Sequence, residues 1–139
     1  MFKNLQTSSG LIYTNENLVL YSIVRIELNM SPGKIGGQCQ HAIQYLMQHY
    51  ANVKYDVATK DGGLFMFRYD NWINGELHTK VILKASDKEW EKLKEEYDPI
   101  IVVDAGKTEI AAGSETVMIL YPMLRDERSK TLKRLQLLK

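Results

Sequence analysis

Two polar segments of this 139-residue chain carry the side chains best suited to chemistry. They span residues 30–42 and 103–117, and each begins where an apolar, strand-like run ends. Open α/β sheets bind ligands at the carboxyl ends of their strands, so neighbouring strands would bring the two segments together. We expect a polar, partly cationic cleft there, built from four residues: Lys34, Asp104, Thr108 and Thr116.

Each of these residues also fits an ordinary structural role. Lys34 alone fits a solvated lysine at the start of a helix, and Asp104 alone fits a carboxylate that closes a loop by accepting backbone N–H groups. The two threonine hydroxyls could likewise be satisfied by nearby backbone. The functional interpretation therefore depends on Lys34 and Asp104 lying close together.

The first Gly-Lys pair, at residues 33–34, lies at a predicted strand-to-helix turn. Backbone N–H groups, the helix dipole and an ammonium together suit an anion such as a phosphate. The pair is not part of a Walker loop, because the first glycine of that motif would fall at Leu28. The second pair, at 106–107, fails the same test at Ile101. Nucleoside triphosphate chemistry is therefore disfavoured.

The single cysteine and three histidines predict neither a zinc site nor a catalytic dyad. Cys39 and His41 are two residues apart on a predicted helix, so their side chains do not face each other. A structural role and a role as a catalytic base both stay open for His41. One cysteine also excludes an intrachain disulfide.

Composition is that of an ordinary globular domain, with 45% apolar residues, 25% charged residues and a net charge of +1. This charge excludes a globally basic nucleic-acid binder, although a local patch could still bind one. Residues 124–139 form such a patch, which suits a polyanion or simply a solvated helix face. With neither a signal-peptide pattern nor an apolar run of about 18 residues, we expect a cytoplasmic protein with no membrane partner.

Apolar periodicity and turn residues predict alternating strands and helices. Strands are expected at 18–28, 80–85, 100–103 and 116–121, and helices at 34–50, 87–97 and 124–135. Ser31 followed by Pro32, and Ser86 with Glu89, are typical helix starts. Alternation of this kind favours an α/β fold with a largely parallel sheet and helices on both faces.

Two stretches are less regular. Residues 1–16 are expected to form an irregular N-terminal lead-in, which leaves 17–139 as a single domain. Within that domain, the segment 51–79 allows two structures. Asn74-Gly75 suits a hairpin turn, or it closes a short helix that carries Phe67 and Trp72.

The two polar segments resemble the signature blocks of type II peptidyl-tRNA hydrolases. The residues that carry the resemblance are Ser-Pro-Gly-Lys-Ile-Gly-Gly-Gln-Cys-Gln-His-Ala at 31–42 and Asp-Ala-Gly-Lys-Thr-Glu-Ile-Ala-Ala-Gly-Ser-Glu-Thr-Val at 104–117. The resemblance extends to 80–84 and 135–138, whereas 51–79 diverges. It implies a three-layer α/β/α, Rossmann-like fold around a four-stranded mixed, mostly parallel sheet.

The resemblance also implies a function, namely hydrolysis of the ester that joins a peptide or an N-blocked amino acid to tRNA, without metal or cofactor. It assigns catalysis to Lys34, Asp104, Thr108 and Thr116. The residues expected to bind tRNA are Gln38, His41, Lys107, Ser114, Arg125 and Lys133. A homodimer is left open.

In the implied mechanism, Lys34 binds a phosphate or the developing oxyanion, and Asp104 orients or deprotonates water. An alternative stays open, because fold alone does not fix function. The chain has Pro32 where the family often has lysine, and glycines at 36 and 37 where it has alanines. These departures are compatible with a non-catalytic RNA- or protein-binding module on the same fold.

Overall fold

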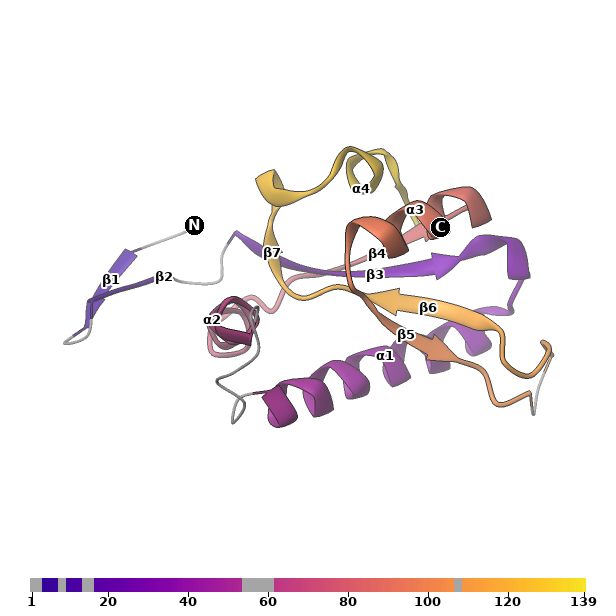
Figure 1. Ribbon diagram of the computed structural model, residues 1–139, viewed down its shortest axis with the longest axis horizontal. Helices are drawn as coiled ribbons and strands as arrows, with labels where there is room; N and C mark the ends of the chain where they lie inside the picture. The colour runs from indigo at the N-terminus through magenta and orange to yellow at the C-terminus, as the bar shows by residue number, and fades with distance from the viewer. Residues whose placement is uncertain (1–3, 8–9, 14–16, 54–61, 107–108) are drawn as a thin grey trace.

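The computed structural model describes residues 4–7, 10–13, 17–53, 62–106 and 109–139. Helices and strands alternate along most of this chain (Figure 1). Their bounds are β1 Asn4–Thr7, β2 Gly10–Tyr13, β3 Leu18–Arg25, the 3-10 helix η1 Ile26–Leu28, α1 Pro32–Val53, α2 Gly62–Ile73, β4 Lys80–Ala85, α3 Asp87–Glu96, β5 Ile100–Val103, β6 Glu115–Ile119, β7 Met123–Leu124, the 3-10 helix η2 Arg125–Glu127, α4 Lys130–Arg134 and β8 Gln136–Leu137.

The main sheet is mixed and six-stranded, with the order β5-β6-β3-β4-β8 and with β7 also paired to β3. Only β3 and β4 pair in parallel; the ladders β3–β6, β5–β6, β3–β7 and β4–β8 are antiparallel. The expected α/β class is confirmed, but a mostly parallel, four-stranded sheet is wrong. Strands β3, β4 and β5 do run the same way, yet β6 returns between β3 and β5 and makes both of those contacts antiparallel.

Helices cover both faces of this sheet, as expected. Figure 1 shows α1 and α2 on one side and α3 and α4 on the other. The long strand β3 is buried on both faces, because Leu18, Leu20 and Val24 join the core under α1 and α2. Its alternate residues, among them Val19 and Ile23, join the second core. The apolar run that predicted this strand therefore has partners on each side.

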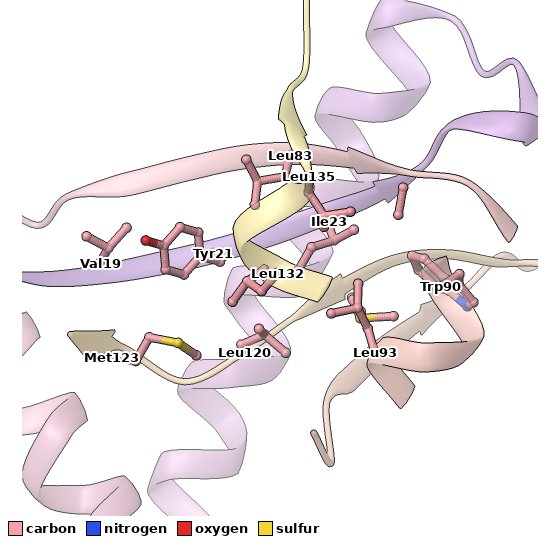
Figure 2. Close-up of a cluster of buried hydrophobic side chains, with 12 residues drawn as sticks. Val19, Tyr21, Ile23, Leu83, Trp90, Leu93, Leu120, Met123, Leu132 and Leu135 are labelled. Atoms are coloured by element: carbon pink, nitrogen blue, oxygen red, sulfur yellow. The ribbon is translucent and has the colours of Figure 1, made fainter. Parts of the chain in front are cut away.

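The second core lies between the sheet and the helices α3 and α4. Trp90 and Leu93 of α3 and Leu132 of α4 belong to this core together with Tyr21 of β3, and Figure 2 shows the four among its buried side chains. Trp90, Leu93 and Leu132 are each at most 1% exposed. Because α3 begins directly after β4, this packing fixes the end of the sheet where β3, β4 and β5 finish.

The structure confirms the helices expected at 34–50 and 87–97 and decides between the two structures open for 51–79. Helix α1 extends a few residues beyond both expected ends, and Ser86 caps α3 in the expected capping box, in which Ser86 and Glu89 exchange hydrogen bonds. The open segment contains a helix, α2, rather than a hairpin. The Asn74 N–H donates to the Asp70 carbonyl at 3.0 Å and closes its last turn.

Two other regions differ from expectation. The helix expected over 124–135 is wrong, because the segment divides into β7, η2, the five-residue α4 and β8. Helix α4 begins only after its cap Ser129, and Gln136–Leu137 pair with the outer edge of β4. Strands β1 and β2 form an antiparallel ladder where an irregular lead-in is expected. The division into a lead-in and one domain stays a prediction.

Within the described ranges, every helix is too short or too polar to cross a bilayer.

The capping box of α3 makes a direct stability test. We expect Ser86→Ala to lower the free energy of unfolding by about 1 kcal/mol, because the Glu89 N–H loses its acceptor. Urea unfolding measures the change. Lys92→Ala on the exposed face of the same helix is the control, with an expected change within about 0.5 kcal/mol. Equal losses in the two variants would show that the box does not stabilise α3.

Candidate functional site

The start of α1 and the loop after β5 meet at the carboxyl ends of β3 and β5. Ser31 caps α1, since its hydroxyl accepts the Lys34 N–H at 3.3 Å and its carbonyl accepts the Ile35 N–H at 2.9 Å. The Ser31 N–H in turn donates to Glu109 Oε1 at 2.8 Å. Glu109 belongs to the loop after β5, so this bond ties that loop to the first turn of α1.

Lys34 and Asp104 form an ion pair at this junction. The Lys34 Nζ donates to Asp104 Oδ1, and the two side chains are 13% and 5% exposed. The other carboxylate oxygen, Oδ2, accepts the Gly106 N–H at 2.8 Å. The meeting of ammonium and carboxylate predicted from the two polar segments is therefore confirmed, and the pair is shielded from bulk water.

These contacts favour the charged form of Asp104. The hydrogen bond from Lys34 lowers the pKa of Asp104 below its ordinary value of 3.8, and the Gly106 N–H and the Lys34 charge act in the same direction against the effect of burial. Asp104 is therefore ionised at neutral pH and has little tendency to take up a proton. Such a carboxylate suits orienting a partner better than storing a proton.

The loop that carries Asp104 is held by its own backbone. The Asp104 N–H donates to the Ser114 carbonyl and the Gly113 N–H donates to the Asp104 carbonyl, both at 2.9 Å. Gly106 has φ +79°, and a Cβ built on it would lie 2.4 Å from the Cβ of Ala112. Only glycine fits that position. The β5–β6 register shifts next to this loop, because Val102 pairs with Val117 and Val103 with Glu115, which leaves Thr116 as the extra residue on β6. Such irregularities are common beside active sites.

A second polar pair lies under the helix. Gln38 Nε2 donates to Thr116 Oγ1 at 2.8 Å, and Thr116 Oγ1 donates to the Val102 carbonyl at 3.2 Å. Gln38 is 4% exposed and Thr116 is fully buried. Both were expected near the cleft, Thr116 as a catalytic group and Gln38 as a tRNA contact. Their hydrogen bonds connect α1, β5 and β6 close to Asp104 in the chain.

His41 lies on the same face of α1 as Lys34 and Gln38, by the spacing of helical neighbours. It is exposed, and its ring stacks on that of Tyr45 at 6.0 Å between centroids and 15° between planes. Gly36 and Gly37, in the first turns of the helix, face open space, with nothing among the described residues within 4 Å of a built Cβ.

Other predicted residues lie elsewhere. Ser114 flanks the site through its backbone, which bonds to Asp104 and Ala111. Arg125 follows β7, which pairs with the amino end of β3, and Lys133 is on α4, across the sheet from α1. The structure does not bring these two cations to the ion pair. Lys107 and Thr108 lie outside the described residues.

Sequence reasoning missed a charged network that anchors β6 at the same edge. Glu115 accepts hydrogen bonds from Trp90 Nε1 at 3.0 Å and from Lys94 Nζ at 2.9 Å, and these bonds lower the pKa of Glu115 below its ordinary value. Arg25 at the end of β3 binds Asp87 at 2.7 Å. The sequence did contain one indication of this network: Trp90 and Lys94 are four residues apart on α3, so both can face the same partner.

In the part of the chain that the structure describes, no three His, Cys, Asp or Glu side chains are grouped as a metal ion would require.

The model of the peptidyl-tRNA hydrolase PTH2 family matches residues 18–138, a range that includes both polar segments and the ion pair between them. The chain belongs to this family. The PTH2 match also spans residues 51–79, the segment that diverges from the signature blocks.

A yeast protein is among the relatives of the chain. The protein named peptidyl-tRNA hydrolase 2 of Saccharomyces cerevisiae is 33% identical over 108 residues, which cover 72% of this chain and 48% of the yeast protein. The chain therefore spans about half the length of this curated relative.

Gly106 and Gly113 form a matched pair for testing the Asp104 loop. We expect Gly113→Ala to lower the free energy of unfolding by about 1–2 kcal/mol, the cost of a positive φ, because its surroundings are open. Gly106→Ala should cost more, because the new methyl group also collides with Ala112. Urea unfolding of both variants checks the order, and equal losses would contradict the close approach at Gly106.

The ion pair predicts a specific pH dependence. Because the folded-state pKa of Asp104 is lowered, its contribution to stability is fully present above 3.8 and is lost as the pH falls through the folded value. We expect the thermal stability of the wild type to exceed that of Asp104→Asn by a constant margin from about pH 7 to about pH 5. The margin should shrink below that range. A margin that instead grows on acidification would show that the Asp104 pKa is raised.

Proposed function

We propose that this protein hydrolyses the ester between a peptide, or an N-blocked amino acid, and the 3′ end of tRNA, releasing tRNA for reuse. The observation that carries the proposal is the shielded Lys34–Asp104 pair, which joins two segments 70 residues apart at the strand ends of a PTH2-family chain. We include the cytoplasm as its place of action in the proposal, because peptidyl-tRNA arises on ribosomes.

An ester of this kind is already reactive, so an enzyme mainly has to position water and stabilise the oxyanion that forms at the ester carbonyl. Lys34 supplies a positive charge at a helix N-terminus, where the helix dipole adds to its attraction for negative charge. In the proposed mechanism, the Lys34 ammonium stabilises the oxyanion or an adjacent phosphate of the tRNA end.

Asp104 acts by orientation in this mechanism. Its lowered pKa makes it a weak proton acceptor, and its two oxygens hold the Lys34 ammonium and the Gly106 N–H. We propose that it fixes the ammonium and accepts a hydrogen bond from the attacking water. The proton of that water leaves with the 3′ oxygen of the tRNA as the ester bond breaks.

Thr116 and Gln38 act behind the reacting atoms. Both side chains are buried and bonded to each other, and Thr116 also bonds to the carbonyl of Val102, two residues before Asp104. We assign them positioning roles, because they hold α1 against the strand that leads to Asp104. Thr108 keeps its proposed role as a hydrogen-bonding partner in the same loop.

The tRNA body needs contacts outside the cleft. His41 and Ser114 lie beside the site, and with Lys107 we assign them to the acceptor end of the tRNA. Arg125 and Lys133, which lie elsewhere on the molecule, are assigned to more distant phosphates. The ion pair forms within one chain, so a homodimer is not required to build it.

Turnover of N-acetylaminoacyl-tRNA tests the proposal. We expect Lys34→Met and Asp104→Asn each to lower kcat by about 10²–10⁴-fold, the usual effect of removing an oxyanion donor or a group that handles water. The measurement is release of free tRNA under saturating substrate. Lys92→Met, an exposed lysine on the opposite face of the sheet, is the matched control and should keep wild-type kcat.

Two outcomes would contradict this function. Wild-type turnover by either site variant would remove the pair from the mechanism. Tight binding of N-acetylaminoacyl-tRNA by the wild type with no release of product would favour the non-catalytic RNA-binding module.

A further inference from the structure

Strand β5 has a partner on one side only among the described strands. It ends the sheet order β5-β6-β3-β4-β8, and α1 packs over one of its faces. Its last residue, Val103, is 54% exposed and directly precedes Asp104. An edge strand carries backbone N–H and C=O groups that can pair with another extended chain. This edge leads straight to the ion pair.

The ladder shows which groups face outward. Leu120 directly follows β6, and its N–H donates to the Tyr21 carbonyl at 3.1 Å, so the backbone groups at this position point toward β3. Backbone groups alternate in direction along a strand. Ile119 and Val117 therefore point theirs the other way, toward β5.

The partners of these two residues on β5 are Ile100 and Val102. Both therefore direct their N–H and C=O groups at β6, in agreement with the 3.2 Å bond between the Val102 carbonyl and Thr116 Oγ1. Ile101, between them, must direct its N–H and C=O groups away from the sheet. It offers one donor and one acceptor to an extended chain.

On the basis of the proposed function, we propose that the peptide part of the substrate adds to the free edge of β5 as a parallel strand. The Ile101 N–H donates to a peptide carbonyl, and the Ile101 C=O accepts a peptide N–H. The direction follows from the chemistry. The scissile ester is at the carboxyl end of the peptide, and β5 runs toward Asp104, so only a parallel strand delivers the ester carbonyl to Lys34 and Asp104.

Recognition through backbone groups suits a substrate whose side chains vary, because every peptide offers the same N–H and C=O groups. The extra residue at the register shift, Thr116, lies on β6, so the free edge of β5 continues to Val103 without an inserted residue. At about 3.3 Å per residue, Ile101 lies about 10 Å back along the strand from Asp104. A peptide of three or four residues therefore reaches it, whereas a single N-acetylated residue does not.

The test compares N-acetylalanyl-tRNA with N-acetyl-tetra-alanyl-tRNA. We expect the wild type to show a kcat/KM about tenfold higher for the longer substrate, the effect of roughly two net hydrogen bonds. Ile101→Pro removes the outward N–H and leaves the bonds to β6, and should bring the ratio of the two values close to one. Ile101→Ala, which truncates the same side chain but keeps the N–H, should keep the wild-type ratio.

Backbone amide exchange of the wild-type protein supplies a measurement that does not depend on the folding of any variant. An amide-linked tetra-alanyl-3′-amino-3′-deoxyadenosine, which cannot be hydrolysed as an ester, is the probe. At saturation it should slow exchange of the Ile101 N–H at least tenfold, while the inward-facing Val102 N–H serves as the internal reference.

The outcomes separate the two proposals. No turnover of either substrate would overturn the proposed function. Turnover of both with equal kcat/KM, or an Ile101 exchange rate that the probe leaves unchanged, would overturn the peptide site alone. Protection of the Ile101 N–H without probe, together with a dimeric mass, would assign the edge to a second copy and would likewise overturn it.

Discussion

The surrounding structure has to stabilise the shielded ion pair between Lys34 and Asp104 and hold its two side chains together. Both side chains are largely shielded from water, and a shielded charge is stable only when it is paired and hydrogen-bonded. Asp104 therefore needs the Gly106 N–H in addition to the ammonium. Lys34 needs a fixed helix start, which Ser31 and Glu109 provide together by tying α1 to the loop after β5.

The order of the strands explains how these groups meet. Because β6 lies between β3 and β5, the loop from β5 to β6 is a direct antiparallel connection at the edge where α1 begins. Gln38 and Thr116 bridge α1 to β6 and to the Val102 carbonyl on β5. On the other face, Trp90 and Lys94 hold Glu115 at the first residue of β6. Contacts on both faces thus fix the loop that carries Asp104.

Several of these features could be predicted from sequence because they depend on local pattern. The apolar run of β3, the capping box at Ser86 and the polar residues at strand ends all follow from neighbours in the chain. Asp104 directly follows such a run, and Lys34 follows another after a short turn. Their convergence required only that strands running the same way finish at one edge.

The parts that sequence did not predict depend on tertiary contacts. Alternation of strands and helices indicates the direction of β3, β4 and β5, but not that β6 inserts between two of them. The leucines and basic residues of 124–135 fit a helix, yet β7 pairs with β3, η2 follows it, and α4 begins only after Ser129. From the sequence, Glu109 is an ordinary loop carboxylate, and only the folded chain shows that it accepts a hydrogen bond from the Ser31 N–H.

A double-mutant cycle tests most directly whether Lys34 and Asp104 act as one unit. It compares the turnover of N-acetylaminoacyl-tRNA by Lys34→Met, by Asp104→Asn and by the variant that carries both changes. Our account predicts that the double variant is no slower than the slower single variant, because either change already removes the pair. Losses that multiply in the double variant would show that the two residues act independently, and would contradict the account.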